Sequence, residues 1–117
     1  MIRVVNKKTH KPTPDDCYIG RGSVMGNPYH HKESNHPQAL YKVDTVEEAI
    51  EGYNKYLEYS YFNDASINKF IKELIDRELD DQNTNLVCYC SPDKCHGDII
   101  KKFVEDGASQ IKWREFI

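Results

Sequence analysis

A chain of 117 residues with 30% charged and 38% apolar residues fits one water-soluble globular domain, which we place over residues 1–117. Its formal net charge of −3 argues against an extended nucleic-acid footprint, because such binding requires a basic face, and leaves room only for local basic patches. No apolar run approaches the roughly 20 residues of a membrane-spanning helix, and the N-terminus lacks the apolar core of a signal peptide. We therefore expect a cytoplasmic protein with reduced thiols and no membrane partner; the sequence does not indicate its oligomeric state.

The first predicted elements are two short strands and the loop that follows them. Residues 2–6 are rich in β-branched side chains and unbroken by Gly or Pro, which predicts a strand. Residues 7–16 contain two prolines and form a loop, and residues 17–19 predict a second strand. Residues 20–29, here called the glycine loop, contain three glycines and an Asn-Pro pair, which predict a tight irregular loop. A polar connection follows it as far as residue 37.

Two amphipathic helices come next. The caps that the sequence offers are Asp44 or Thr45 for the first helix, with Glu47 or Glu48 completing a capping box, and Asn63 or Asp64 for the second. Apolar side chains recur at helical spacing in both, at Val46, Ala49, Ile50, Tyr53 and Leu57 and then at Ile67, Phe70, Ile71, Leu74 and Ile75. Both stripes are typical of helices that pack on a core.

The C-terminal part predicts a strand, a turn, a helix and a last strand. The strand spans residues 86–90, and the turn, here called the cysteine turn, spans residues 88–98. We expect the helix to end near Gly107 and an alternating pattern over residues 110–117 to form the last strand. Strands separated by helices predict a small single-domain α/β fold with a mostly parallel, Rossmann-like reduced sheet flanked by about three helices. The first two strands could instead pair antiparallel.

The glycine loop is the first candidate for ligand binding. Backbone amides without side chains can face an anion, and Arg21 can add a bidentate charged contact to it. The loop matches neither the dinucleotide fingerprint nor the P-loop, so a plain surface loop is the competing interpretation. The candidate ligand-binding residues in it are Gly20, Arg21, Gly22, Ser23, Gly26, Asn27, Pro28 and Tyr29.

The cysteine turn is the second candidate site, and zinc is one interpretation of it. Cys88 and Cys90 project to the same side of an extended segment, so they could share an ion with Cys95 and His96. The spacing is atypical of zinc sites, and adjacent helical residues such as Cys95 and His96 diverge by about 100°. Zinc is therefore possible but not favoured as a cofactor.

Thiol or acid/base chemistry is the second interpretation of this turn. A Cys95 thiolate at a helix start would be stabilised by the helix dipole, with His96 as proton carrier and Asp98 as its orienting partner or a second acid/base. Cys88, Tyr89 and Cys90 would then line the ligand. In the structural alternative, Cys88 and Cys90 are small core residues, Ser91 or Asp93 caps the helix, and His96 hydrogen-bonds a carbonyl.

Taken together, the two segments resemble a family of small bacterial and phage domains of unknown function. The resemblance lies in Gly20-Arg21-x-Ser23-x-x-Gly26-Asn27-Pro28-Tyr29 and in Cys88-x-Cys90-x-Pro92-x-x-Cys95-His96-Gly97-Asp98, and it covers most of the chain. A tryptophan is usual in that family between the first two cysteines, where this chain has Tyr89. A stacking role survives this change, whereas a role for the indole N–H does not.

These observations predict one pocket, formed by the glycine loop and the cysteine turn, for a nucleotide-like or other phosphate-bearing small molecule. Arg21 and loop amides would hold phosphate, and Asn27 would contact sugar or base. If the ligand is processed, the protein is a hydrolase or transferase that uses His96, Asp98 or Cys95. The alternatives are a phage-type sponge that sequesters a nucleotide signal without turnover, and a zinc-stabilised module that binds protein or nucleic acid.

Overall fold

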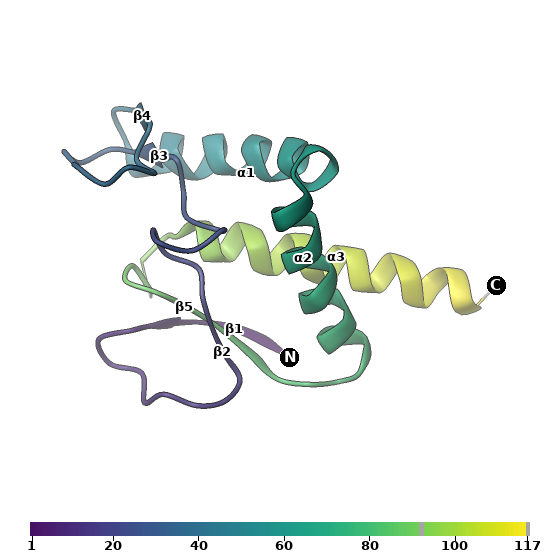
Figure 1. Ribbon diagram of the computed structural model, residues 1–117. Helices are drawn as coiled ribbons and strands as arrows, with labels where there is room; N and C mark the ends of the chain where they lie inside the picture. Colours follow the sequence, from purple (N-terminus) through teal and green to yellow (C-terminus); the bar gives the residue numbers. More distant parts are fainter. Residues whose placement is uncertain (92, 117) are drawn as a thin grey trace.

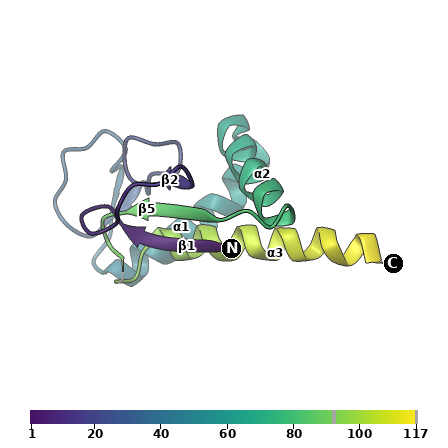
Figure 2. The same ribbon diagram turned by 90° about the horizontal axis from the view of Figure 1, so that it is seen from below.

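The computed structural model describes residues 1–91 and 93–116 and shows a small α/β fold, as predicted. Its strands and helices are, in chain order, β1 (Ile2–Asn6), β2 (Asp16–Tyr18), β3 (Tyr29–His30), β4 (Tyr41–Lys42), α1 (Val46–Asn63), α2 (Ala65–Leu79), β5 (Thr84–Cys88) and α3 (His96–Phe116). The helices lie on one side of the sheet, with α3 next to it and α1 farthest away (Figures 1 and 2). Within the described residues, no helix is both long and apolar enough to cross a membrane.

The main sheet is three-stranded in the order β1-β5-β2, with β5 in the centre. Both outer strands pair parallel with β5, so the mostly parallel sheet is confirmed and the antiparallel alternative for β1 and β2 is wrong. All five residues of β5 are buried, as expected for the central strand of a parallel sheet. The carboxyl ends of β2 and β5 therefore lie side by side, and the glycine loop and the cysteine turn leave the sheet at the same edge.

Helices α1 and α2 begin where the capping residues predict. The Thr45 side chain accepts a hydrogen bond from the Glu48 backbone N–H at 3.1 Å, which is half of a capping box. The Asp64 carboxylate accepts from the N–H groups of Ser66 and Ile67 at 2.9 and 3.2 Å. These side chains satisfy backbone donors that the first turn of a helix leaves free.

The predicted end of the last helix at Gly107 and the predicted strand over residues 110–117 are wrong. Helix α3 continues through Gly107 to Phe116, and Ile117 lies outside the described residues. Gly107 serves packing instead, because a Cβ atom there would lie 2.9 Å from the Ile75 Cδ1 atom of α2. The apolar side chains of Val104, Ala108 and Ile111 recur at helical spacing, which continues the helix beyond the glycine.

A second, two-stranded sheet is formed by β3, at the junction of the glycine loop and the predicted polar connection, and by β4, in a segment for which no element was predicted. It packs on the N-terminal half of α1, where the Tyr29 ring lies against Gly52. A Cβ atom at Gly52 would come within 2.8 Å of that ring, so the glycine allows the close contact. The strands are too short for their sequence pattern to reveal them.

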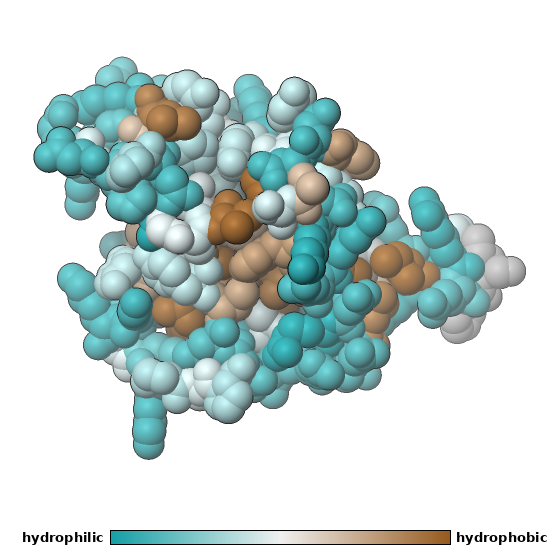
Figure 3. Space-filling model, in the orientation of Figure 1, coloured by the Kyte–Doolittle hydropathy of each residue, from teal (hydrophilic) through white to brown (hydrophobic). Residues whose placement is uncertain are grey.

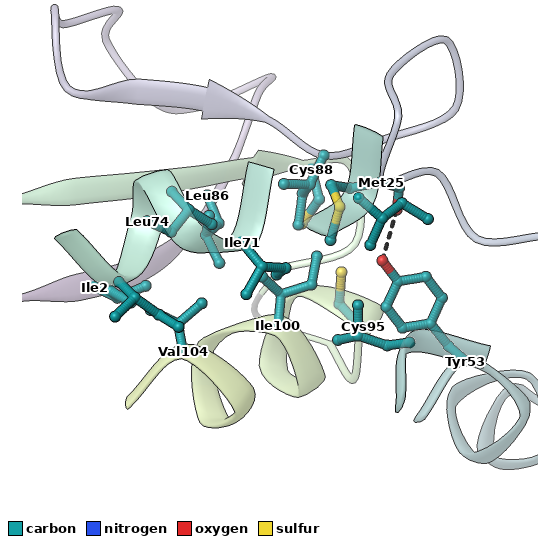
Figure 4. Close-up of a cluster of buried hydrophobic side chains, with 14 of the residues drawn as sticks. Ile2, Met25, Tyr53, Ile71, Leu74, Leu86, Cys88, Cys95, Ile100 and Val104 are labelled. Atoms are coloured by element: carbon teal, nitrogen blue, oxygen red, sulfur yellow. Dashed lines mark hydrogen bonds between the residues drawn. The ribbon is translucent and has the colours of Figure 1, made fainter. Parts of the chain in front are cut away.

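The core lies between the sheet and the three helices (Figure 4). Tyr53 of α1 is fully buried in it and donates a hydrogen bond from its hydroxyl to the Met25 carbonyl at 2.9 Å. Met25 is also fully buried and belongs to the glycine loop. This buried contact therefore fixes the glycine loop to α1, and it is drawn as a dashed line in Figure 4.

We expect Tyr53→Phe to lower the free energy of unfolding by about 1–3 kcal/mol, because it leaves the buried Met25 carbonyl without its donor. Tyr59→Phe is the matched control: that side chain is 68% exposed on the same helix, and its loss of a hydroxyl should change stability by less than about 0.5 kcal/mol. Urea denaturation of both variants measures the difference. Equal stabilities would contradict the buried tether.

Candidate functional site

The glycine loop and the cysteine turn meet in one pocket of about 560 Å³. The remaining walls come from the segment of residues 30–36 and from the start of α1. Among the residues predicted for the site, those that line the pocket are Gly20, Arg21, Asn27, Tyr29, Cys88, Tyr89, Cys90, Cys95 and His96. Gly22, Ser23, Gly26, Pro28 and Asp98 do not appear in its wall.

Arg21 holds the glycine loop in shape while it faces the pocket. Its guanidinium group donates from Nε to the Asn27 carbonyl at 3.1 Å and from one terminal nitrogen to the Tyr29 carbonyl at 3.0 Å. Both acceptors are neutral, so the positive charge of Arg21 remains available to an anion in the pocket. The planar guanidinium has five N–H donors, and these two bonds leave others free.

The other polar groups of the loop stabilise its backbone. The Asn27 side chain accepts from the Tyr29 N–H at 2.9 Å and donates to the Ala49 carbonyl at 3.3 Å. The oxygen and the nitrogen of this amide are thus both hydrogen-bonded within the protein, whereas the sequence suggested a contact with sugar or base. The Ser23 hydroxyl donates to the Gly20 carbonyl at 2.6 Å, and Gly22 has a φ of 100°, which favours glycine.

Two tyrosines form an aromatic edge beside the loop. The rings of Tyr18 and Tyr89 meet edge to face with centroids 6.3 Å apart, and the Lys7 ammonium lies 4.9 Å from the Tyr18 centroid. The Tyr18 hydroxyl donates to the Arg21 carbonyl at 3.0 Å, and a Cβ at Gly20 would clash with the Tyr18 ring. Tyr89 is 50% exposed, so its ring is accessible for stacking.

Cys95 caps the N-terminus of α3. Its sulfur accepts a hydrogen bond from the Gly97 N–H at 3.3 Å, and its own N–H donates to the Asp98 carboxylate at 3.2 Å. This reciprocal arrangement is a capping box with cysteine in the place of serine. Asp98 is exposed, and its described contact is with this backbone.

His96 is buried and contacts the Ile19 carbonyl, the Cys95 sulfur and the Tyr53 ring. Its Nε2 atom lies 2.6 Å from the Ile19 carbonyl, which can only accept, so Nε2 carries the proton and Nδ1 has a free lone pair. Nδ1 lies 3.5 Å from the Cys95 sulfur, and the ring meets Tyr53 edge to face at 4.9 Å. Burial lowers the pKa of His96 below its ordinary value of 6.5, which keeps the ring neutral.

The thiols of Cys88, Cys90 and Cys95 form a cluster at the pocket wall. The Cys95 thiol can donate to either neighbour, which lowers the pKa of Cys88 to about 6 and that of Cys90 to about 7, and raises the pKa of Cys95. Figure 4 shows the Cys95 side chain pointing from α3 toward Cys88. In the described part of the chain, no group of three or more His, Cys, Asp or Glu side chains is arranged to hold a metal ion.

Sequence reasoning missed the basic wall of the pocket. The additional charged or titratable residues that line it are His30, His31, Lys32, Glu33, His36 and Lys94. Most of these residues form a pattern that is visible in the sequence, with three histidines and a lysine among the seven residues after the glycine loop. The polar composition of this segment predicts only a connection. In Figure 3 the surface around β3 and β4 is mostly hydrophilic, with one hydrophobic group beside β4.

Comparison with known proteins identifies a family model that matches residues 2–106, described as "Domain of unknown function (DUF4326)". The match includes the glycine loop, the cysteine turn and the first half of α3. No curated protein and no solved structure matches the chain.

We expect the stability of the protein to fall from about pH 8 to about pH 5 more steeply than that of a His96→Gln variant. The folded-state pKa of His96 lies below 6.5, so the unfolded chain binds more protons in this range and the stabilisation present above pH 6.5 is lost as the pH falls. Denaturant titrations across this range measure both curves. The other titrating groups are shared, so parallel curves would contradict a buried neutral His96.

Proposed function

The chain belongs to the family of DUF4326 domains, and we propose that it binds a nucleotide-like, phosphate-bearing small molecule in the pocket between the glycine loop and the cysteine turn. The chemistry of the pocket wall supports this function. The setting of the proposed activity is the reducing cytoplasm.

The observation that carries the proposal is the charge of the pocket. Its described wall contains the cations of Arg21, Lys32 and Lys94 but one carboxylate, Glu33, in a chain whose net charge is −3. Glu33 itself lies 3.4 Å from the Lys42 ammonium, which offsets its charge. Lys94 approaches the Glu47 carboxylate only to 3.9 Å, and exposed pairs of this kind are weak. The pocket therefore favours an anionic ligand.

The size and the aromatic edge of the pocket suit a nucleotide. A volume of about 560 Å³ lies within the usual range of roughly 300–1,000 Å³ for small-molecule sites. Arg21 and the lysines would bind phosphate oxygens, and the exposed Tyr89 ring would stack on a base. The histidines of the segment after the loop would add hydrogen bonds to phosphate or sugar.

Binding without turnover is the form of the function that the contacts favour. Asp98 caps α3, and the Nε2 atom of His96 is bound to a carbonyl, so neither is placed as a free acid/base facing the ligand. Nδ1 of His96 can serve only the Cys95 thiol among its described contacts. A sponge that sequesters a nucleotide signal, as phages would use, fits this arrangement. A hydrolase or transferase acting through Cys95 and His96 is the second candidate.

We expect Lys94→Ala and Lys32→Ala each to raise the Kd for the best-binding nucleotide about tenfold, because each removes a charged hydrogen bond to phosphate. Both side chains are exposed, so the fold should be unaffected. Lys102→Ala is the matched control, since this exposed lysine of α3 pairs with Asp106 and does not line the pocket. Isothermal titration calorimetry measures the affinities. Equal losses in all three variants would contradict a specific phosphate contact.

Capture and turnover are separated by the state of the released ligand. We expect nucleotides and NAD-derived compounds incubated with the protein to be recovered unchanged after heat denaturation, as judged by chromatography. New products that disappear in a Cys95→Ser variant would instead establish the enzymatic alternative. A panel in which no phosphate-bearing compound binds would refute the proposed function in both forms.

A further inference from the structure

The thiol cluster in the pocket combines an exposed cysteine with a buried one that can react with it. Cys90 is exposed in the cysteine turn, whereas Cys95, at the start of α3, is 2% exposed. Both line the same pocket, and the Cys95 thiol lies within hydrogen-bonding reach of Cys90. A solvent-accessible thiol next to a second thiol is the usual arrangement of a peroxide-sensitive cysteine pair.

The surroundings make the Cys90 thiol more reactive toward an oxidant than the Cys95 thiol. A hydrogen bond from the Cys95 thiol and the nearby positive charge of Arg21 both lower the pKa of Cys90, which reaches about 7. The pKa of Cys88 is also lowered, to about 6, but this side chain is only 1% exposed and its sulfur lies 3.6 Å from the Val5 carbonyl, so it is shielded from solvent and from an external oxidant. Exposure therefore makes Cys90 the thiol that a peroxide reaches first.

We propose that Cys90 and Cys95 form a reversible disulfide when the protein meets a peroxide, with Cys90 as the thiol oxidised first and Cys95 as the thiol that resolves it. The oxidant is hydrogen peroxide or an alkyl hydroperoxide, and a small dithiol reduces the bond again. This chemistry goes beyond ligand binding and does not depend on it.

In the first step, the Cys90 thiolate attacks one peroxide oxygen and the O–O bond breaks. Cys90 becomes a sulfenic acid, the peroxide is reduced, and the leaving hydroxide takes up the proton that Cys90 had released, which gives water. In the second step, the Cys95 sulfur attacks the Cys90 sulfur, the S–O bond breaks, and the hydroxyl group leaves as water with the Cys95 proton. Two thiols and one hydrogen peroxide thus give one disulfide and two waters; with an alkyl hydroperoxide the first leaving group is an alkoxide, which takes up the Cys90 proton and gives an alcohol in place of the first water.

The contacts of Cys95 support its role in the second step. Once Cys90 is a sulfenic acid, the Nδ1 atom of His96, 3.5 Å from the Cys95 sulfur, takes up the Cys95 proton and passes it to the hydroxyl group that leaves as water. The Gly97 N–H, which points at the same sulfur at 3.3 Å, stabilises the thiolate that forms. His96 acts here as a positioning and proton-accepting group for Cys95.

The test treats the reduced full-length chain with hydrogen peroxide and maps its thiols by mass spectrometry. We expect the mass to fall by two hydrogens, a Cys90–Cys95 cross-linked peptide to appear, and Cys17 and Cys88 to remain free for alkylation. Cys17 is an internal control, because burial raises its pKa and it does not line the pocket. Dithiothreitol should restore all four thiols.

Two variants decide between the roles of the cysteines. Cys95→Ser keeps a hydroxyl acceptor at the helix cap, so it should fold, lose the disulfide and accumulate a Cys90 sulfenic acid that dimedone traps. Cys90→Ser should lose both the disulfide and the dimedone adduct. A cross-link to Cys88 or Cys17, an unchanged disulfide in either variant, or thiols that resist peroxide in the folded protein would overturn the proposal.

Discussion

The hydrogen bond from His96 Nε2 to the Ile19 carbonyl is the contact on which the site depends. Ile19 follows β2 and His96 begins α3, so this bond joins the start of the glycine loop to the end of the cysteine turn. Gly97 permits the approach, because a Cβ there would lie 2.9 Å from both Ile19 Cδ1 and Val4 Cγ1. An unpaired carbonyl and imidazole at this depth would be costly, so the contact fixes both segments at one sheet edge.

The sequence was informative where local signals agree with one another. The limits of β1 and the caps at Thr45 and Asp64 were predicted because β-branched runs and capping side chains act within a few residues. The end of α3 was missed because Gly107 suits two purposes, termination or close packing. The helical spacing of Val104, Ala108 and Ile111 favours close packing, and the Ile75 side chain of α2 shows what the glycine packs against, which no local pattern reports.

The same limit applies to the site. The sequence indicated that each of the two chemical segments follows a strand and that they form one pocket, and the structure places both in one pocket wall. The sequence could not indicate that the amide of Asn27 and the carboxylate of Asp98 form hydrogen bonds with backbone groups. Asn and Asp are common both in ligand sites and in turns and caps, since the same acceptor oxygens serve either purpose. Here the backbone uses them, and a loop hydrogen-bonded in this way would present Arg21 to the proposed ligand with little left to order.

Ligand binding and thiol oxidation would act on the same short turn. Cys90 follows Tyr89 directly, and Lys94 precedes Cys95, so a Cys90–Cys95 bond would constrain the backbone that presents both proposed ligand contacts. Linkage then requires reciprocity: a disulfide that weakens ligand binding by a given factor is itself disfavoured by the ligand by the same factor. A bound anion would also raise the pKa of Cys90 by like-charge repulsion and so slow its oxidation. This electrostatic effect has a definite sign, so an anion in the pocket would protect Cys90 from oxidation.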